Sequence, residues 1–248
     1  MAEMSGPLRI ERRPDRVVAT LDRPAARNAI DQATIDALHE LCAELEAEPR
    51  ILILTGAGGV FASGADIAEL RERSGADAQA GINAHAFIRV HALPMPVIAA
   101  VDGWALGGGA ELAYAADIRI ATSEARFGNP ETGLGIIAAA GASWRLPEII
   151  GGGRAIELLL TGRIVDAEEA LAIGLVSSLY PVESLLDAAH AIADQIAAND
   201  PRATQLTKAV FAAPREAHPG VDLEAQAELF DSPEKLRRMT EFLERKKR

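Results

Sequence analysis

Two short segments of the chain carry residue types suited to moving protons beside a carbonyl group. The first, residues 107–111, reads Gly-Gly-Gly-Ala-Glu, and the second, residues 129–131, reads Asn-Pro-Glu. A glycine run that opens a helix leaves backbone N–H groups unobstructed, with the positive end of the helix dipole behind them, so it can stabilise a developing oxyanion. Glu111 follows Gly108 by three positions and would lie on the same side of such a helix. Together with Glu131, these residues predict acid–base chemistry at carbon next to a carbonyl.

The surroundings of Glu111 favour a shifted pKa. An exposed helical glutamate is the commonest fate of this residue type, but the neighbours here are small or apolar: Leu106, Ala110, Leu112 and Ala113. A carboxyl group beside apolar surface and beside a second carboxyl group has a raised pKa, as general acid–base catalysis requires. If Glu111 and Glu131 lie close together, their titration belongs to the pair.

A second turn, residues 61–66 (Phe-Ala-Ser-Gly-Ala-Asp), follows an apolar strand at residues 51–54. Taken alone, it is an ordinary tight turn in which Asp66 caps a helix over residues 67–73. Together with the glycine run, this turn can also be interpreted as a second source of oxyanion donors, because a carbonyl oxygen is held best by two N–H donors from different segments. Loss of one such donor lowers the rate of a reaction by roughly 10²–10³-fold.

The elements that would position these turns alternate between strand and helix. Five apolar segments are predicted as strands: residues 8–12, 16–21, 51–54, 96–101 and 117–121. A helix is predicted over residues 30–45, with Asp31 as its N-cap. The last two strands lead to the two candidate segments, each as a strand–turn–helix unit. This alternation predicts an α/β fold.

The sequence becomes predominantly helical after about residue 151. Helices are predicted at residues 155–160, 167–173, 185–198, 203–211 and 222–246. Their apolar content needs a covering surface, either the core or another subunit. No Ser/Gly-rich linker separates the two parts, so neither is expected to move independently.

Composition and charge narrow the function. The 248 residues suit one large domain or a domain with an appendage, and the formal net charge of −11 argues against a general nucleic-acid-binding protein. No apolar run reaches the roughly 18 residues needed to cross a bilayer, and the N-terminus lacks the features of a secretory signal. We therefore expect a cytoplasmic protein without membrane association. The basic residues 245–248 are either a solvated end or a local site for a small anionic ligand.

The residue pattern does not favour metal, disulfide or nucleotide chemistry. Cys42 is the only cysteine, and the five histidines lack the spacing of a metal site. No Gly-Lys-Ser/Thr follows a glycine-rich segment, which excludes a phosphate loop. Residues 133–138 match a loose dinucleotide pattern, but no strand precedes them and no acidic residue ends a second strand afterwards. Ser63 lacks a nucleophile elbow. The paired glutamates therefore remain the best candidates for chemistry.

Taken together, these residues resemble the crotonase, or enoyl-CoA hydratase/isomerase, superfamily over nearly the whole chain. Residues 21–30 (Leu-Asp-Arg-Pro-Ala-Ala-Arg-Asn-Ala-Ile) resemble the N-terminal segment with which the family contacts coenzyme A. Residues 61–66 resemble the first oxyanion loop and residues 104–112 the second. Residues 127–134 resemble the segment that carries the second catalytic glutamate. The oxyanion motif combined with both glutamates at the family's separation is highly specific.

The resemblance implies an architecture. It is an α/β fold in which residues 1–195 form a crotonase-like spiral of strand–strand–helix turns. Residues 196–248 would form a C-terminal helical trimerisation region. The protein would be a homo-oligomer, either a trimer or a dimer of trimers.

The resemblance also implies a site. Glu111 and Glu131 correspond to the two catalytic glutamates, and the N–H groups of Ala65 and Gly108 to the oxyanion hole. The substrate-binding residues that it implies are Ala25, Arg27, Ala65, Asp66, Ile67, Ala68 and Gly108. Neither a metal nor a cofactor is expected, since coenzyme A is part of the substrate.

The activity that the resemblance implies is enoyl-CoA hydration, the syn addition of water to a 2-trans-enoyl-CoA to give a 3-hydroxyacyl-CoA in fatty-acid or related acyl-CoA degradation. Glu111 would orient and deprotonate the water and Glu131 would protonate C2, although a coupled pair can share these roles. One alternative is an enoyl-CoA isomerase or another CoA-thioester lyase of the superfamily. Another is an acyl-CoA-binding protein without catalysis.

The chain departs from the family pattern at four places. Ala138 and Ala139 replace the usual Pro-Gly, and residues 141–146 (Gly-Ala-Ser-Trp-Arg-Leu) replace a more common Gly-Gly-Thr-Gln-Arg-Leu. Ala25 replaces a common lysine, and residues 236–239 replace an acidic-Gly-Met pattern. The change at Ala138 and Ala139 is expected to affect the acyl-chain preference rather than the placement of water, because the backbone is kept.

Overall fold

The structure is a computed structural model that describes residues 3–245. Its chain forms two compact units, Met1–Ala193 and Asp194–Arg248. Of the basic residues 245–248 noted in the sequence, 246–248 lie outside the described residues. Within the described part of the chain, no helix combines the length and apolar character needed to span a membrane.

The first unit is built on a seven-stranded sheet with the order β1-β2-β3-β4-β6-β8-β11. Its strands are β1 (Glu3–Ser5), β2 (Leu8–Arg12), β3 (Arg16–Leu21), β4 (Ile51–Gly56), β6 (Val97–Val101), β8 (Ile118–Thr122) and β11 (Leu179–Tyr180). The sheet is antiparallel from β1 to β3 and parallel from β3 to β11. Both faces of its centre are covered, which explains the continuous apolar run of β4.

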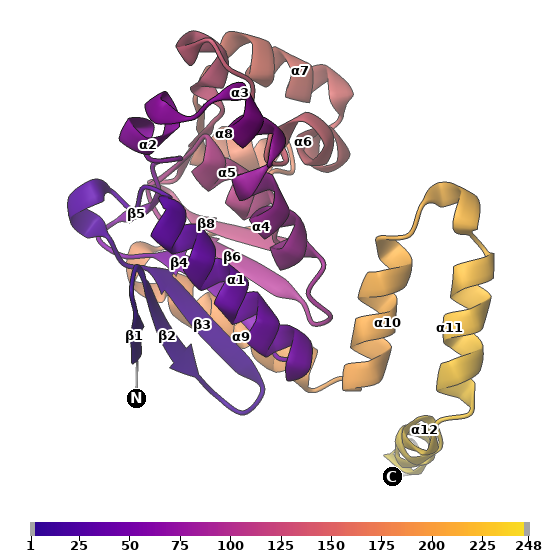
Figure 1. Cartoon of the computed structure of the whole chain (residues 1–248). Coiled ribbons are helices and arrows are strands. Elements are labelled where there is room, and N and C mark those ends of the chain that lie inside the picture. The colour runs from indigo at the N-terminus through magenta and orange to yellow at the C-terminus, as the bar shows by residue number, and fades with distance from the viewer. Residues whose placement is uncertain (1–2, 246–248) are drawn as a thin grey trace. The chain divides into compact units, whose positions relative to one another are not determined.

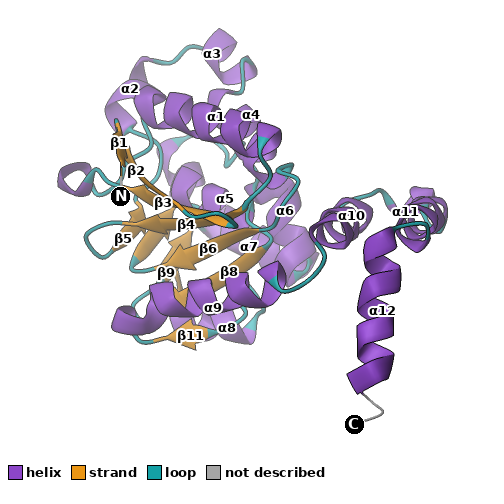
Figure 2. Cartoon of the chain, turned by 90° about the horizontal axis from the view of Figure 1, so that it is seen from below, coloured by secondary structure: helices purple, strands orange, loops and turns teal. Residues whose placement is uncertain are grey.

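Helices lie on both faces of this sheet, and this confirms the predicted α/β fold. Figures 1 and 2 show α1 (Gln32–Ala47) and α4 (Ile82–His91) on one face and α9 (Leu185–Ala197) on the other. Asp31 caps α1 as predicted, because its Oδ1 accepts the Thr34 N–H at 2.8 Å. The apolar stripe of α1, which includes Leu38 and Leu45, is buried against the sheet.

A second, four-stranded sheet with the order β10-β9-β7-β5 corrects one detail of the sequence interpretation. Its strands are β5 (Val60–Ala62), β7 (Trp104–Leu106), β9 (Arg126–Gly128) and β10 (Val165–Asp166). Each unit predicted as strand–turn–helix therefore contains a second short strand. The helices that follow are α2 (Ile67–Glu72), α5 (Gly108–Tyr114) and the 3-10 helix η2 (Pro130–Leu134). These strands are too short for a periodic signal and are stabilised by pairing with each other.

Further short helices complete the first unit. They are η1 (Pro24–Ala26), α3 (Gly75–Gln79), α6 (Ala142–Ile150), α7 (Gly152–Thr161), α8 (Ala167–Ala172) and η3 (Val182–Ser184). The predicted helices at 155–160 and 167–173 correspond to α7 and α8. The sequence did not indicate α6, because Pro147 lies inside it.

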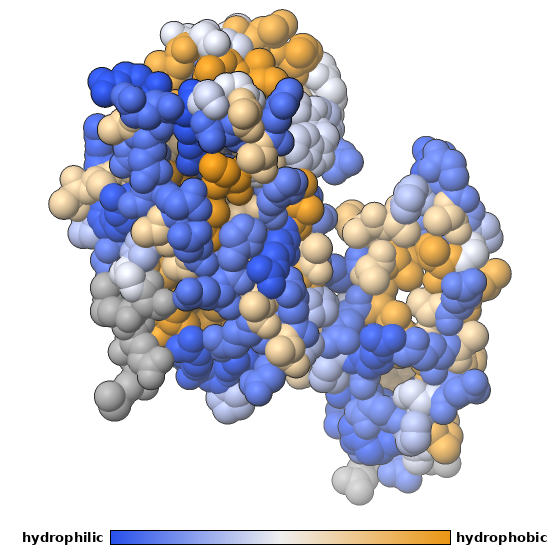
Figure 3. All heavy atoms as spheres, in the orientation of Figure 1, coloured by the Kyte–Doolittle hydropathy of each residue, from blue (hydrophilic) through white to orange (hydrophobic). Residues whose placement is uncertain are grey.

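The second unit is helical, with α10 (Pro201–Phe211), the 3-10 helix η4 (Arg215–Ala217), α11 (Gly220–Phe230) and α12 (Pro233–Arg245). The single helix predicted over residues 222–246 is wrong, because the chain breaks between α11 and α12. Pro233 has no N–H to continue a helix, and the Ser232 hydroxyl oxygen caps α12 by accepting the Lys235 N–H at 3.1 Å. Figure 3 shows apolar surface along the helices of this unit.

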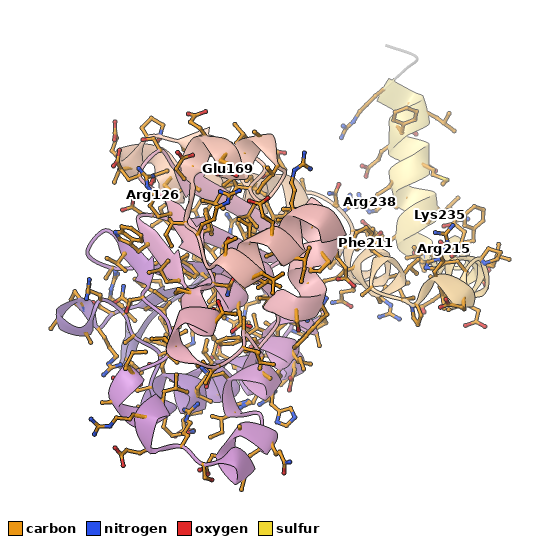
Figure 4. The ribbon with its side chains drawn as sticks, turned by 90° about the horizontal axis from the view of Figure 1, so that it is seen from above. Arg126, Glu169, Phe211, Arg215, Lys235 and Arg238 are labelled. Carbon is orange, nitrogen blue, oxygen red and sulfur yellow. The ribbon has the colours of Figure 1, made fainter. Side chains whose placement is uncertain are left out.

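Polar contacts hold the helices of the second unit together. Arg202 of α10 pairs with Glu228 of α11, with Nη2 at 2.9 Å from Oε2. Arg238 of α12 donates to the Ala198 carbonyl oxygen at 2.9 Å, and the Lys235 ammonium lies 4.8 Å from the centre of the Phe230 ring. Figure 4 labels Arg238 and Lys235 on α12, separately from Arg126 and Glu169 of the first unit.

Candidate active site

One cavity of about 490 Å³ in the first unit contains the four residues predicted to do chemistry. Ala65 lies in the turn before α2, Gly108 and Glu111 lie on α5, and Glu131 lies on η2. The three turns that follow β5, β7 and β9 reach this cavity because these strands are neighbours in the smaller sheet. The strand pairing thus brings residues far apart in the sequence to one place.

The local backbone leaves the Ala65 N–H free. Ile30 pairs with this turn as in a parallel sheet: its N–H donates to Gly64 O at 2.8 Å and its carbonyl accepts the Asp66 N–H at 2.9 Å. This pairing uses the groups on either side of Ala65. Within the described part of the chain, the Ala65 N–H itself has no acceptor. It is therefore available to a ligand.

The Gly108 N–H is free for a different reason. Gly108 is the first residue of α5, and the first bond of the helix runs from the Glu111 N–H to Gly107 O at 3.0 Å. Among residues 3–245 no acceptor takes the Gly108 N–H. Gly107 has φ 50° and ψ −125°, a conformation that requires glycine. Its N–H donates to Gly128 O at 2.8 Å, which fixes the turn to the end of β9.

The two free N–H groups lie beside each other. A side-chain carbon built on Gly108 would lie 3.5 Å from the Ala65 nitrogen and 3.6 Å from Asn83 Nδ2. Asn83 belongs to α4 and also lines the cavity. Its Oδ1 accepts a hydrogen bond from Arg73 at 3.1 Å, so its NH₂ group remains as a donor near the same point. Two amides and a side-chain amide thus converge where an oxyanion could be held.

Glu111 is buried and anchored by the backbone. Its side chain is only 3% exposed, and Oε1 accepts the N–H groups of Ala140 at 2.7 Å and Ala142 at 3.1 Å. Burial raises its pKa to about 7, and the nearby Glu131 carboxylate adds to the rise, while these backbone hydrogen bonds oppose it. Glu111 therefore changes charge close to neutral pH, as a general base or acid must.

Glu131 is buried too, but it has fewer donors. Its Oε1 lies 3.4 Å from Asn129 Nδ2. Its Oε2 is buried and has no hydrogen-bond partner within the described residues. Burial raises the pKa of Glu131, and the hydrogen bond from Asn129 opposes the rise. A carboxyl group with an unpartnered oxygen and a raised pKa is suited to carry a proton.

Comparison with known proteins agrees with this geometry. Residues 16–248 match the family model described as enoyl-CoA hydratase/isomerase. The chain belongs to this family. It is 40% identical to the short-chain-enoyl-CoA hydratase of Clostridium acetobutylicum, covering 93% of this chain and 92% of the relative. It is 37% identical to the crotonyl-CoA hydratase of Syntrophomonas wolfei, covering 96% and 95%. An enoyl-CoA hydratase structure from Bacillus anthracis superposes with a TM-score of 0.92 at 34% identity, covering 97% of each chain.

The other residues assigned to substrate binding by resemblance to this enoyl-CoA hydratase/isomerase family do not line the cavity. Ala25 is exposed on η1, and Arg27 is exposed with a left-handed φ of 50°. The Arg27 carbonyl accepts the Ser63 N–H at 3.1 Å, which joins this segment to the first oxyanion turn. Asp66 is the N-cap of α2, where Oδ1 accepts the Ala68 N–H at 3.0 Å. Ile67 and Ala68 are exposed at the start of that helix.

Several cavity residues were not identified from the sequence. They are Leu70, Arg73, Ile82, Asn83, Ile136 and Ile137. Most are apolar, and none of them belongs to a motif that the sequence analysis used. Asn129 belongs to the Asn-Pro-Glu segment, and its position two residues before Glu131 was the signal that could have identified it. Among the described residues, no cluster of three His, Cys, Asp or Glu side chains could hold a metal ion.

Proposed function

We propose that this protein is an enoyl-CoA hydratase that adds water to a 2-trans-enoyl-CoA. The observation that carries the proposal is a single cavity lined by two buried carboxyl groups, Glu111 and Glu131, and by Ala65 and Gly108, whose N–H groups are free. The names of relatives at 40% and 37% identity, a short-chain-enoyl-CoA hydratase and a crotonyl-CoA hydratase, support it. Coenzyme A enters as part of the substrate, and the proposed chemistry needs no other cofactor.

In the proposed reaction, the thioester carbonyl oxygen accepts the N–H groups of Ala65 and Gly108. These donors stabilise negative charge as it develops on that oxygen, and they contribute most in the enolate-like transition state. Water between the two glutamates attacks C3. Its oxygen forms the new C–O bond, one of its protons goes to a carboxylate, and C2 receives a proton from the other carboxyl group. Because both groups line one cavity, the hydrogen and the hydroxyl are added from the same side.

The hydrogen bonds of the two glutamates favour one assignment of roles. Glu111 accepts two backbone N–H groups through Oε1, which stabilises its ionised form, so we assign it to deprotonating the water. Glu131 has an unpartnered Oε2 within the described residues, so we assign it to protonating C2. The protons return between the carboxyl groups before the next turnover. The pair is coupled, and its measured pKa values will belong to both residues.

Hydration of crotonyl-CoA, followed as loss of the ultraviolet absorbance of the conjugated thioester, tests this proposal. We expect turnover with 2-enoyl thioesters, and a panel from short to long acyl chains will identify the preferred length. Conversion of 3-enoyl to 2-enoyl thioesters without hydration would make the protein an isomerase. Affinity for CoA esters without any turnover, unchanged by charge-neutral substitutions at both glutamates, would make it a binding protein.

We also infer that residues 196–248 assemble copies of the chain into a trimer or a dimer of trimers. Large apolar side chains of α10, α11 and α12 are more than half exposed: Phe211, Leu223, Phe230, Leu236, Met239, Phe242 and Leu243. Apolar surface of this extent usually marks an interface. The cytoplasmic location remains a prediction from the sequence.

A further inference from the structure

Helix α5 carries a third polar group beside the two that the proposed function uses. Glu111 follows Gly108 by three positions and Tyr114 follows Glu111 by three, so each of these two pairs consists of neighbours on the helix surface. Tyr114 is only 3% exposed, and its hydroxyl donates to Asn129 Oδ1 at 3.1 Å. Asn129 is 2% exposed. The two side chains thus form a buried polar contact between α5 and the segment that carries Glu131.

The Asn129 amide is held from both ends, with the Tyr114 hydroxyl as donor at Oδ1 and two acceptors at Nδ2. With Oδ1 toward Tyr114, Nδ2 lies 3.4 Å from Glu131 Oε1 and 3.5 Å from Gly107 O. If the amide were turned over, Oδ1 would face both of these acceptors with no hydrogen between them, which is repulsive. The NH₂ group of Asn129 therefore faces the Glu131 carboxyl group and the carbonyl oxygen of Gly107, the residue before Gly108. Both distances are long, as is common before a substrate tightens a site.

This arrangement determines which oxygen of Glu131 is free. Oε1 is the oxygen near Asn129, while Oε2 has no partner within the described part of the chain. We propose that Tyr114 is a positioning residue that acts through Asn129 to hold the Glu131 carboxyl with Oε2 free for the reacting proton. The inference rests on the proposed hydratase function. It adds that the helix supplying Glu111 and the Gly108 donor also orients the opposite carboxyl group.

Loss of the Tyr114 hydroxyl has different effects if its role is structural and if its role is to position Glu131. Tyr114→Phe removes the donor and keeps the ring, so the packing of α5 is retained. A structural role predicts lower stability with unchanged catalysis. A positioning role predicts that kcat falls while KM changes little, because Glu131 loses its orientation. One hydrogen bond of ordinary strength corresponds to about a three- to tenfold fall in kcat.

The pH dependence of kcat distinguishes the two roles, because a change in stability alone does not shift it. Without the Tyr114 donor the Asn129 amide is held at one end only, so its hydrogen bond to Glu131 weakens and the pKa of Glu131, which this bond lowers, rises further. Glu131 acts in its protonated form, so the alkaline limb of kcat should move to higher pH by about 0.5–1 unit. Tyr180→Phe is the matched control, since it removes the same group from β11, outside the cavity.

An NMR titration of carboxyl-labelled glutamate tests the proposal without turnover. The Glu131 signal is assigned by its loss in Glu131→Gln and followed in the parent, Tyr114→Phe, Asn129→Leu and Tyr180→Phe. We expect its midpoint to move upward in the first two of these variants and to stay in the Tyr180 control. If Tyr114→Phe does not fold, Asn129→Leu tests the step from Asn129 to Glu131, and an unmoved midpoint in that variant overturns the proposal.

The two hypotheses fail separately. A folded Tyr114→Phe protein whose Glu131 midpoint and kcat match the parent overturns the positioning role and leaves the hydratase proposal standing. A fall in kcat with an unmoved Glu131 midpoint also overturns it. A parent protein that hydrates no enoyl thioester overturns the proposed function, while the NMR comparison still decides whether Tyr114 controls the Glu131 carboxyl.

Discussion

Gly109 lies directly against Ala62, so close that a Cβ on Gly109 would stand 2.3 Å from the Ala62 carbonyl oxygen. Gly109 is in the first turn of α5, and Ala62 ends β5 immediately before the first oxyanion turn. This contact joins the two segments that supply the Ala65 and Gly108 N–H groups. The spacing of the oxyanion donors therefore depends on the absence of one methyl group.

Gly109→Ala should lower both stability and activity. The methyl group would overlap with backbone, which cannot move away as a flexible side chain can, so the two turns must separate. We expect a loss of about 1–3 kcal/mol in the free energy of unfolding, together with a fall in kcat. Urea denaturation and crotonyl-CoA hydration measure the two effects. Gly153→Ala is the control: this α7 glycine has open space around it, and alanine there should keep or increase stability. Equal behaviour of the two variants would contradict this interpretation.

Glu131→Gln should nearly abolish hydration. The amide keeps the shape of the side chain but cannot deliver the proton to C2, and loss of general acid catalysis lowers rates by about 10²–10⁴-fold. We expect the fall in kcat, with KM for crotonyl-CoA changed little, because the oxyanion donors still hold the thioester. Steady-state kinetics at several pH values measure both constants. Hydration near the parent rate would rule out this role for Glu131.

Glu111→Gln should make the protein more stable at alkaline pH. The folded-state pKa of about 7 lies above the ordinary value of 4.5, so the folded state keeps its proton longer than the unfolded state. The contribution of Glu111 to stability is therefore greatest below pH 4.5, falls as the pH rises to about 7, and is then constant. A shift of this size corresponds to roughly 3 kcal/mol at most. Glutamine cannot ionise, yet it still accepts the Ala140 and Ala142 N–H groups.

The free energy of unfolding of the parent and of Glu111→Gln, measured in urea at pH 4.5 and pH 8, checks this prediction. We expect a difference at pH 8 that is small at pH 4.5. Glu124→Gln at an exposed position is the control and should change neither value. A difference between the parent and Glu111→Gln that is independent of pH would show that ionisation of Glu111 is not the cause.

Charge on the apolar face of α12 should weaken assembly. Leu236 and Leu243 are 66% and 59% exposed and stand two helical turns apart on one side of α12. Their joint replacement by glutamate would place charges within the inferred interface, so we expect a smaller particle than the parent trimer or hexamer. Size-exclusion chromatography with light scattering measures the mass. Arg245→Glu, which makes the same change in net charge on the opposite side of the helix, is the control. A monomeric parent protein would refute the assembly.

The turns and the candidate residues Ala65, Gly108, Glu111 and Glu131 could be located from the sequence, but not the cavity that they line. Glycines and the Asp66 cap placed the starts of α2 and α5, because a tight turn before a helix permits few residue types. The units predicted from the sequence missed β7 and β9. These three-residue strands are stabilised by pairing with strands that are distant in the sequence. Asn83 and Arg73 line the cavity from a segment without a recognisable motif. The contact from Tyr114 to Asn129 depends on tertiary packing, which no local pattern reports.

Oε1 of Glu111 accepts hydrogen bonds from the backbone N–H groups of Ala140 and Ala142. Every residue type except proline has this backbone donor, so the side chains at positions 140 and 142 can change while both hydrogen bonds are kept. Ala139 and Ala140 meanwhile form part of the cavity wall. We therefore expect substitutions at positions 139 and 140 to change the space for the acyl group while the backbone hydrogen bonds to Glu111 are kept.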